Sequence, residues 1–267
     1  METITLGDGT NLKVAAPYKW PEYWSLVQNE TWERYTVATI RSLTPGSVML
    51  EIGGWIGSTA LIAAAVGAEV HSFEPDPKAL VAFRQHLEWN PELAQRITLH
   101  AAAVSTETGR AILANDSLGD STSSLVKRKG ETVEVDTVDV RDLLPEPWID
   151  RVALVKLDIE GGEYQLAAAL ADVLKRIGTP RFLLSTHVDY LQDLVPINND
   201  VVRKAVIRVY LLRHPLVVWK FRCYTHWHIP AGAGWRPVNR WLVVVRLFMH
   251  RNREFLLSDH QLGGDLR

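Results

Sequence analysis

The chain has 267 residues, of which 47% are hydrophobic and 22% are charged, and its formal net charge is −2. This composition excludes a disordered tail and a wholly basic nucleic-acid binder, and a chain of this length predicts one domain with appendages. The single cysteine, Cys223, excludes an internal disulfide and a four-thiolate zinc site. Because the first residues also lack a signal-like apolar run and no stretch is long enough to span a bilayer, we expect a cytoplasmic protein.

The first 46 residues are predicted to form an N-terminal extension. Residues 1–16 alternate apolar and polar side chains around Gly7-Asp8-Gly9, which is typical of a small hairpin. The apolar spacing of residues 30–43 fits a helix, and Thr44-Pro45-Gly46 ends it. We expect this extension to cap the substrate side of a larger unit, residues 47–267.

From residue 47 onward, predicted strands and helices alternate. This alternation indicates βαβ units and a mainly parallel, buried sheet, in which ligands bind at the carboxyl ends of the strands. The predicted strands are residues 47–52, 69–73, 97–104, 152–159 and 181–187, and the predicted helices are residues 58–66, 78–90 and 163–177.

Two regions depart from the alternation. Residues 110–140 contain two short predicted strands, 111–114 and 132–135, around a polar loop, 115–124, which we expect to border a cofactor. After the fifth strand we expect an amphipathic helix, and then two strands that complete the sheet as an antiparallel hairpin. These three elements are residues 201–212, 216–224 and 241–247.

Positive charge is concentrated towards the C-terminus. Residues 201–253 contain eleven Lys or Arg residues and no Asp or Glu. Such a segment favours an anionic partner, such as a phosphorylated sugar carrier, a nucleotide-sugar or a membrane surface that the protein contacts peripherally. A solvated basic face without a ligand explains the same pattern equally well.

The first candidate site is the turn that follows the strand ending at residue 52. Glu51 precedes a turn that contains Gly53, Trp55 and Gly57, and a helix begins near Ser58. Glycines let a backbone approach a ligand, a helix N-terminus offers unpaired amides, and Glu51 can receive a ligand's ammonium group. The turn lacks the Gly-x-Gly-x-x-Gly dinucleotide fingerprint, so it favours S-adenosylmethionine over NAD. The alternative is a tight turn without a ligand.

Acidic side chains follow two further predicted strands. Glu74 precedes Pro75, and its two carboxylate oxygens match the vicinal diol of a ribose, although a turn or capping role is the alternative. Asp158 and Glu160 share one face of a strand end, where we expect Asp158 at the reaction centre and Glu160 at the substrate. Glu163 lies in the first turn of the next helix, either for function or because negative charge is favourable there.

These motifs resemble the FkbM family of methyltransferases. The resemblance spans roughly residues 30–187, and it is carried by Glu51-Ile-Gly53-Gly54-Trp55-Ile-Gly57, Phe73-Glu74-Pro75, Thr137-Val-Asp139 and Lys156-Leu-Asp158-Ile-Glu160-Gly161-Gly162-Glu163. It implies a Rossmann-like class I methyltransferase fold, which we expect to contain a mainly parallel seven-stranded sheet and a C-terminal antiparallel hairpin. It also implies transfer of a methyl group from S-adenosylmethionine to hydroxyls, often on sugars or polyketides.

One departure from the family pattern is the pair Gly54-Trp55, because family members usually have Ala-Asn there. Trp55 is expected either to stack near the methionine part of the cofactor or to shape the acceptor pocket. His187 ends the fifth predicted strand, where the resemblance also suggests a histidine. An imidazole suits removal of a proton from a hydroxyl, so we predict that His187 is the general base. A histidine that is merely hydrogen-bonded at a sheet edge is the alternative.

Three further residues are weaker candidates for substrate contacts. Glu33 is either an acceptor contact or a helix-surface carboxylate. His226 and His228 have the spacing for one strand face, and line a pocket or belong to the ordinary surface. Two histidines do not define a zinc site, and binding of Mg²⁺ by Asp158 and Glu160 stays an open alternative.

The sequence therefore predicts a methyltransferase that uses S-adenosylmethionine to methylate a hydroxyl of a sugar-bearing or polyketide-like small molecule, itself anionic or carrier-linked. An NAD-linked oxidoreductase is the first alternative, against which Glu51 and the turn spacing count. A non-catalytic module of the same fold that docks on an anionic partner is the second. The chain has no Asn/Asp-Pro-Pro-aromatic element, so we expect no nucleic-acid substrate. The sequence predicts no oligomeric state.

Overall fold

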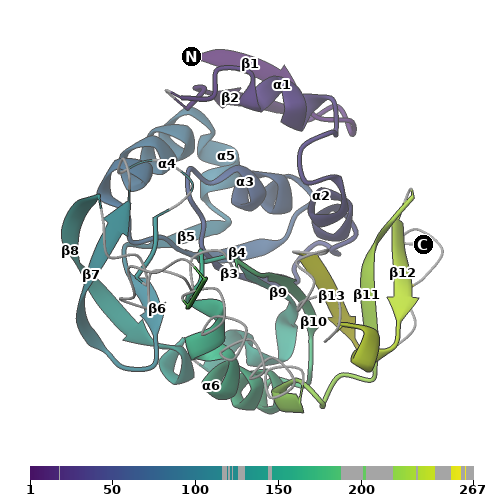
Figure 1. The fold of residues 1–267 in the computed structure, drawn as a ribbon. Helices are drawn as coiled ribbons and strands as arrows, with labels where there is room; N and C mark the ends of the chain where they lie inside the picture. The colour runs from purple at the N-terminus through teal and green to yellow at the C-terminus, as the bar shows by residue number, and fades with distance from the viewer. Residues whose placement is uncertain are drawn as a thin grey trace.

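An eight-stranded sheet is the central element of the computed structural model of the chain (Figure 1). The description covers residues 1–17, 19–115, 119, 121, 123–125, 130–143, 146–187, 201–202, 219–232, 234–243, 254–259 and 262. In spatial order the strands are β12 (Gly234–Val238), β11 (His226–Ala231), β13 (Glu254–Ser258), β10 (Arg181–Ser185), β9 (Val152–Leu157), β3 (Val48–Ile52), β4 (Glu69–Phe73) and β5 (Ile97–His100). This sheet is one strand larger than the predicted one.

Five neighbouring strands, β10, β9, β3, β4 and β5, run parallel, as the alternation of elements predicts. β3 is buried at every position, which is typical of a strand covered on both faces. Ile52 at the end of β3 lies opposite Phe73 and Leu157, and Leu157 lies opposite Leu184 in β10. The residues that follow these four strands therefore meet at one edge of the sheet.

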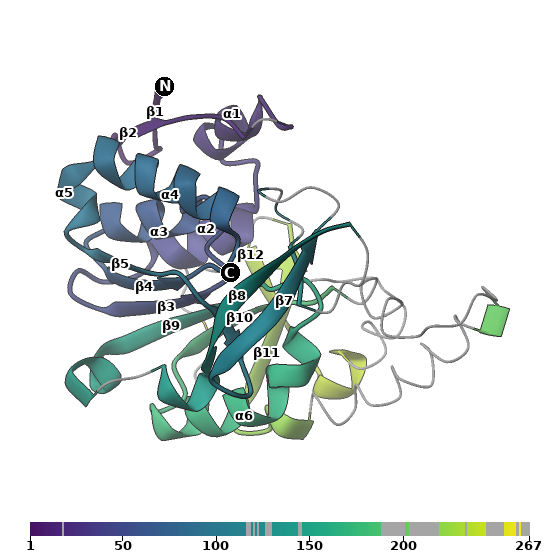
Figure 2. The same ribbon diagram turned by 90° about the vertical axis from the view of Figure 1, so that its left-hand side faces the viewer.

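Helices cover both faces of the sheet (Figure 2). One face carries α2 (Arg34–Arg41), α3 (Ser58–Ala65), α4 (Pro77–Trp89) and α5 (Pro91–Ala94), and the other carries α6 (Glu163–Arg176), which follows the 3₁₀ turns η1 (Val140–Asp142) and η2 (Glu146–Arg151). In α6, Leu166, Leu170 and Leu174 recur every four residues, so they form one apolar stripe that packs on the sheet. The sheet thus separates two hydrophobic cores.

The N-terminal extension packs on the face that carries α3 and α4. Its predicted hairpin is confirmed as β1 (Glu2–Thr5) and β2 (Asn11–Val14), and its predicted helix as α2; the short helix α1 (Tyr23–Gln28) was not predicted. The buried His86 of α4 accepts a hydrogen bond from the Ala15 N–H (3.0 Å) and donates to the Ile56 carbonyl (2.9 Å). One imidazole thereby joins the extension to the turn after β3.

The predicted strand over residues 97–104 is two strands in the structure. β5 belongs to the main sheet, whereas β6 (Ala103–Ser105) forms a separate three-stranded sheet with β7 (Gly109–Asn115) and β8 (Glu131–Asp139). β7 and β8 extend beyond the short strands that the sequence predicts. Their antiparallel backbone pairing over seven positions stabilises residues whose side-chain pattern alone does not favour a strand.

The C-terminal hairpin exists, but strands other than the predicted ones form it. The described parts of residues 216–224 and 241–247 are helical or turn residues, and β11 and β12 form the hairpin instead. These strands contain Pro230 and Pro237, which count against a strand in the sequence. The structure accommodates both because β12 is an edge strand and β13 pairs with β11 only from His226 to His228.

The predicted helix over residues 201–212 lies outside the described residues, except for two helical residues at 201–202. Most of the basic segment 201–253 also lies outside them. Its described cationic side chains, Lys220, Arg222, Arg236 and Arg240, are exposed. Within the described ranges, no helix combines the length and the hydropathy that crossing a membrane requires.

Substitution His86→Ala is expected to lower the free energy of unfolding by about 2 to 4 kcal/mol at pH 8, because it leaves a cavity and two buried backbone groups without partners. Burial lowers the pKa of His86 below its usual 6.5, so the folded protein keeps this imidazole neutral while the unfolded chain binds a proton. The contribution of His86 to the free energy of unfolding is therefore lost as the pH falls below 6.5. Urea unfolding should show that the difference from the variant narrows between pH 8 and pH 5; a constant difference would contradict this assignment.

Candidate active site

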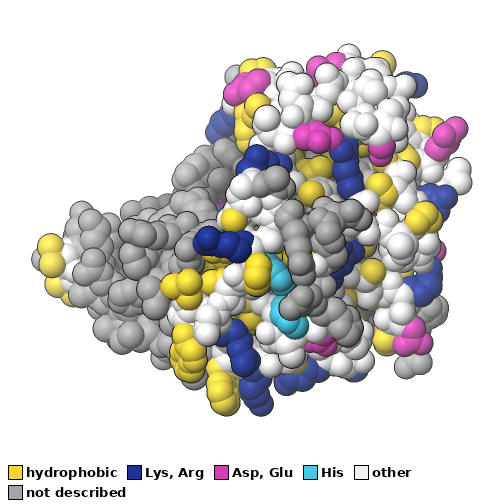
Figure 3. Space-filling model, turned by 90° about the vertical axis from the view of Figure 1, so that its right-hand side faces the viewer, with side chains coloured by type: hydrophobic (Ala, Val, Ile, Leu, Met, Phe, Trp, Pro, Cys, Tyr) yellow, Lys and Arg dark blue, Asp and Glu magenta, His cyan; other side chains and the backbone are white. Residues whose placement is uncertain are grey.

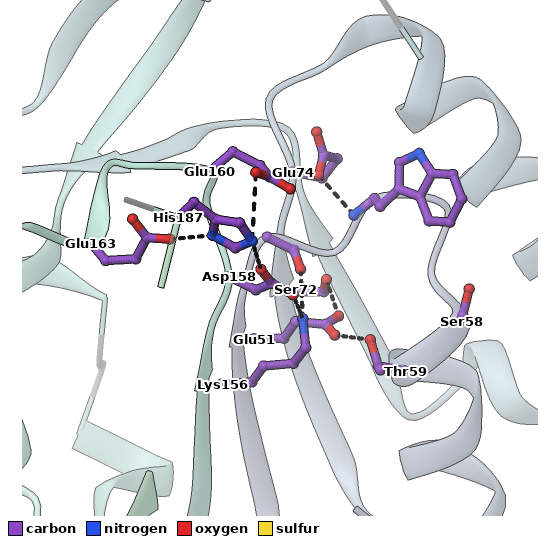
Figure 4. Close-up of polar contacts among 12 residues, drawn as sticks. Glu51, Ser58, Thr59, Ser72, Glu74, Lys156, Asp158, Glu160, Glu163 and His187 are labelled. Carbon is purple, nitrogen blue, oxygen red and sulfur yellow. Dashed lines mark hydrogen bonds and ion pairs between the residues drawn. The ribbon is translucent and has the colours of Figure 1, made fainter. Parts of the chain in front are cut away.

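A pocket lies at the carboxyl ends of the parallel strands. Of the predicted site residues, those that line it are Glu33, Gly53, Trp55, Glu74, Asp158, Glu160 and His187. The ones outside its lining are Glu51, Gly57, His226 and His228. Figure 4 shows how the polar side chains from the ends of β3, β4, β9 and β10 point toward one another.

Glycines shape the turn between β3 and α3. Gly53 has a φ of 95°, and a Cβ atom there would lie 1.9 Å from the carbonyl oxygen of Asp158. The turn and the end of β9 therefore approach as closely as two backbones can. Gly57 also has a positive φ, but a Cβ there would overlap the ring of Phe83 in α4. Its lack of a side chain serves helix packing, so the structure does not favour the predicted cofactor contact for Gly57.

Glu74 is held at the pocket wall by two backbone groups. The N–H of Trp55 donates to one carboxylate oxygen (2.8 Å), and the N–H of Asp76 donates to the other (2.7 Å). Burial raises the pKa of Glu74 to about 8, although these two hydrogen bonds oppose the rise. Each oxygen retains acceptor capacity for a further donor, which is the arrangement that a ribose diol requires.

Trp55 joins the turn to the polar loop over residues 115–124. Its indole N–H donates to the carbonyl of Gly119 (3.1 Å), and Asp76 accepts a hydrogen bond from the N–H of the same glycine (2.7 Å). Ser121 and Ser123 of this loop line the pocket. That the loop borders a cofactor stays a prediction.

Glu51 faces the interior of the protein. It is fully buried, and its carboxylate accepts hydrogen bonds from the hydroxyls of Thr59 and of Ser72 (2.6 Å). Both oxygens therefore have partners from within the fold, which does not support the predicted direct contact with a ligand's ammonium group. Burial raises its pKa, while Lys156, Ser72 and Thr59 oppose the rise.

Lys156 is a site residue that we did not predict. Its buried ammonium donates to Asp158 (3.1 Å) and lies 3.5 Å from the carbonyl of Gly53. Burial alone would lower its pKa, but Asp158, Glu51 and Glu33 outweigh burial and raise it. The signal was available in the sequence, because a single lysine interrupts the apolar strand β9.

His187 lies among three carboxylates. Its Nδ1 hydrogen-bonds to Glu163 (2.6 Å), and its Nε2 lies 3.6 Å from Asp158 and 3.5 Å from Glu160. Burial would lower the pKa of His187, but the hydrogen bond and charge of Glu163, with Asp158 and Glu160, raise it to about 9. Burial would likewise raise the pKa of Asp158, but Lys156 and His187 lower it. The ligand-free protein therefore holds an imidazolium beside a carboxylate at neutral pH.

Aromatic side chains from the N-terminal extension and from the turn after β3 form another part of the lining. Tyr23 contacts Trp20, Trp32 and Trp55 in edge-to-face geometry, with ring centroids 5.0 to 5.1 Å apart. We define these four residues as the aromatic wall; all of them line the pocket. Glu33 lies beside the wall, and burial, with the charge of Asp158, raises its pKa to about 8. Trp20, Tyr23 and Trp32 were not predicted as site residues, because aromatic side chains near a helix equally indicate core.

His226 and His228 lie away from the pocket. Both belong to β11, which β13 and β10 separate from β9. His228 is buried and its Nδ1 contacts the carbonyl of Leu256 (3.2 Å), while His226 contacts the hydroxyl of Thr225 (2.8 Å). These partners are structural, so the expected substrate contact for the two histidines has no support in the structure.

The parallel sheet with helices on both faces, its antiparallel C-terminal hairpin and the pocket at the strand ends define the class I methyltransferase fold. Residues 50–179 match the family model of the methyltransferase FkbM domain. No curated protein matches the chain.

Solved structures of methyltransferases are similar to the chain. A methyltransferase FkbM from Methylobacillus flagellatus is 15% identical with a TM-score of 0.50, and the match covers 92% of this chain but only 56% of that one. The S-adenosylhomocysteine-bound methyltransferase PaMTH1 of Podospora anserina is 13% identical, with a TM-score of 0.44 and coverage of 88% and 79%. A precorrin-6y C5,15-methyltransferase from Geobacter metallireducens is 14% identical, with a TM-score of 0.40 and coverage of 92% and 91%.

Substitution Gly53→Ala is expected to lower the free energy of unfolding by about 2 kcal/mol or more, because the new methyl group would overlap the Asp158 carbonyl at a positive φ. Gly109→Ala is the matched control, since a Cβ there meets nothing within 4 Å. Urea unfolding should show a change of less than about 0.5 kcal/mol for the control. Equal stabilities of the two variants would contradict the close approach of the two backbones.

Proposed function

We propose that this protein transfers the methyl group of S-adenosylmethionine to a hydroxyl of a sugar-bearing or polyketide-like small molecule. One observation carries the proposal: Glu74, which suits a ribose, and the pair Asp158 and His187, which suits a hydroxyl, line the same pocket. The match to the FkbM domain supports the methyltransferase class, and a hydroxyl as the acceptor is part of the proposal.

The charge of the pocket supports S-adenosylmethionine over NAD. Four carboxyl side chains line it, those of Glu33, Glu74, Asp158 and Glu160. Lys156 and His187 balance the charge of Asp158 and Glu160, whereas Glu33 and Glu74, whose pKa values are about 8, lose their protons more readily when a cation enters. The donor carries a sulfonium and an ammonium group, which an acidic wall attracts, whereas the pyrophosphate of NAD would be repelled. Glu51 then acts indirectly, by holding Thr59 and Lys156 in place rather than by binding the donor.

The reaction needs little covalent chemistry from the protein. The acceptor oxygen forms a bond to the methyl carbon as the carbon–sulfur bond breaks, the hydroxyl proton passes to a base, and S-adenosylhomocysteine leaves. Positioning of the two reactants supplies most of the rate enhancement. His187 is the proposed base, and it must first lose the proton that it carries in the ligand-free protein. Entry of the positively charged donor favours that loss.

The lining also indicates which part of an acceptor enters the pocket. The aromatic wall offers flat apolar surfaces with polar edges, which suit the faces of a sugar ring or a macrocycle. The acidic side chains disfavour an anionic group at the reaction centre itself. A charged carrier would instead contact the exposed Lys220, Arg222, Arg236 and Arg240. On the face in Figure 3, cationic and apolar side chains lie next to one another.

The direct test is methyl transfer from S-adenosylmethionine labelled in its methyl group. Purified protein is incubated with panels of glycosides and macrolactones that carry free hydroxyls, and products are detected by label and mass. A gain of one methyl group on oxygen in any panel supports the proposal. Methylation confined to nitrogen or carbon would contradict the hydroxyl as acceptor.

Substitution His187→Gln is expected to lower kcat by about 100-fold or more, because the acceptor hydroxyl loses its base. The dissociation constant of S-adenosylhomocysteine should change less than about threefold, since Glu74 and the turn hold the cofactor. His226→Gln, a histidine outside the pocket, is the control and should retain wild-type activity. A similar loss of activity in both variants would refute the assigned role.

Binding of S-adenosylhomocysteine at pH 7 is expected to release most of one proton. Glu74 has a pKa of about 8 in the free protein, and hydroxyl donors from the ribose stabilise its charged form, so the pKa falls on binding. Calorimetry in two buffers of different ionisation enthalpy measures this release, which should vanish well above pH 8. In Glu74→Gln the release should be absent and affinity should fall by about tenfold or more. Proton release that persists in this variant would contradict the assignment.

A further inference from the structure

We propose that Asp158, Glu160 and His187 bind a divalent transition-metal ion, Mn²⁺ or Zn²⁺, in the wall of the pocket. One ligand atom from each residue lies within 4.8 Å of the other two. The site extends the expected carboxylate pair by an imidazole, and this third donor changes which ion fits.

The distances suit metal ligands that share one ion. The Nε2 atom of His187 lies 3.6 Å from Asp158 Oδ1 and 3.5 Å from Glu160 Oε2. Two ligands at bond lengths of about 2.1 Å are separated by about 3.4 Å when the ligand–metal–ligand angle is tetrahedral. The two distances from His187 therefore already suit a shared ion, and the separation of the two carboxylates, which is within 4.8 Å, would shorten on binding.

The imidazole is oriented for this role by a residue behind it. Glu163 in the first turn of α6 is buried and accepts a hydrogen bond from His187 Nδ1 (2.6 Å), which directs Nε2 toward the two carboxylates. A carboxylate that holds the far nitrogen of a histidine is the usual support of a metal-bound imidazole. Glu163 is thus a positioning residue, and its place at the helix start does not account for this contact.

Lys156 leaves one oxygen of Asp158 available to an ion. Its ammonium binds Oδ2 (3.1 Å), whereas Oδ1 faces His187. Two carboxylates and one imidazole favour Mn²⁺, Fe²⁺ or Zn²⁺, while Mg²⁺ prefers carboxylates and water without imidazole. Three protein ligands leave coordination positions open toward the pocket.

The ion's role rests on the proposed function, but its binding does not. A cation at this place would bind the acceptor oxygen and lower the pKa of its hydroxyl, so that a weak base suffices to remove the proton. With an ion bound, Nε2 of His187 would be a ligand instead of the base, and the proton of the acidified hydroxyl would pass to solvent.

The test is a titration of chelator-treated protein with Mn²⁺. Binding is measured as the loss of the free-ion signal in electron paramagnetic resonance. We expect saturation at one ion per chain, at least tenfold weaker binding in Glu160→Gln and in His187→Gln, and about tenfold weaker binding in Glu163→Gln. Glu69→Gln and His226→Gln, which lie outside the pocket, are the controls. Thermal unfolding of each variant shows whether it is folded.

The outcomes separate this inference from the proposed function. Absence of saturable Mn²⁺ and Zn²⁺ binding, or binding that is unchanged in folded Glu160→Gln and His187→Gln, overturns the metal site. S-adenosylhomocysteine binding is measured on the same samples. Cofactor binding without metal binding leaves the proposed function standing, whereas metal binding without cofactor binding supports the site and removes the function.

Discussion

The buried ammonium of Lys156 is the interaction on which the site depends. A charge that is taken out of water is costly unless it is paired, and here Asp158, the Gly53 carbonyl and the nearby Glu51 surround it. Removing one member of such a buried pair typically costs about 3 to 5 kcal/mol. The pairing therefore fixes the end of β9 against the turn after β3, and the hydrogen bond of Glu51 with Thr59 joins β3 to α3.

This constraint explains where the proposed cofactor residue and the proposed base lie in the pocket. With the ends of β3 and β9 fixed, Glu74 at the end of β4 and His187 beyond β10 lie on either side of one acidic space. The N-terminal extension contributes Trp20, Tyr23 and Trp32 to the aromatic wall, and hydrogen bonds from Ala15 to His86 and from Tyr23 to Ser58 join it to the rest of the fold. The positive charge of the donor thus faces the acidic side chains, and the apolar ring of the acceptor faces the aromatic wall.

The parallel strands could be predicted to within a few residues because buried strands are continuous apolar runs that end at glycine or acid. The same property located Glu74, Asp158 and His187. It failed for β11 and β12, which contain Pro230 and Pro237. These prolines are tolerated because each of them faces a paired strand on one side only. It also failed to predict the direction of the Glu51 side chain. Every position of β3 is buried, so the alternation of side chains does not tell which of them face the pocket.

Titration calorimetry with S-adenosylhomocysteine and with NADH distinguishes a methyltransferase from an oxidoreductase, because the two ligands share a ribose and differ in charge. We expect micromolar binding of S-adenosylhomocysteine and no detectable binding of NADH. Binding of NADH alone would contradict the methyl-transfer account and restore the oxidoreductase alternative, and binding of neither would favour a non-catalytic module of the same fold.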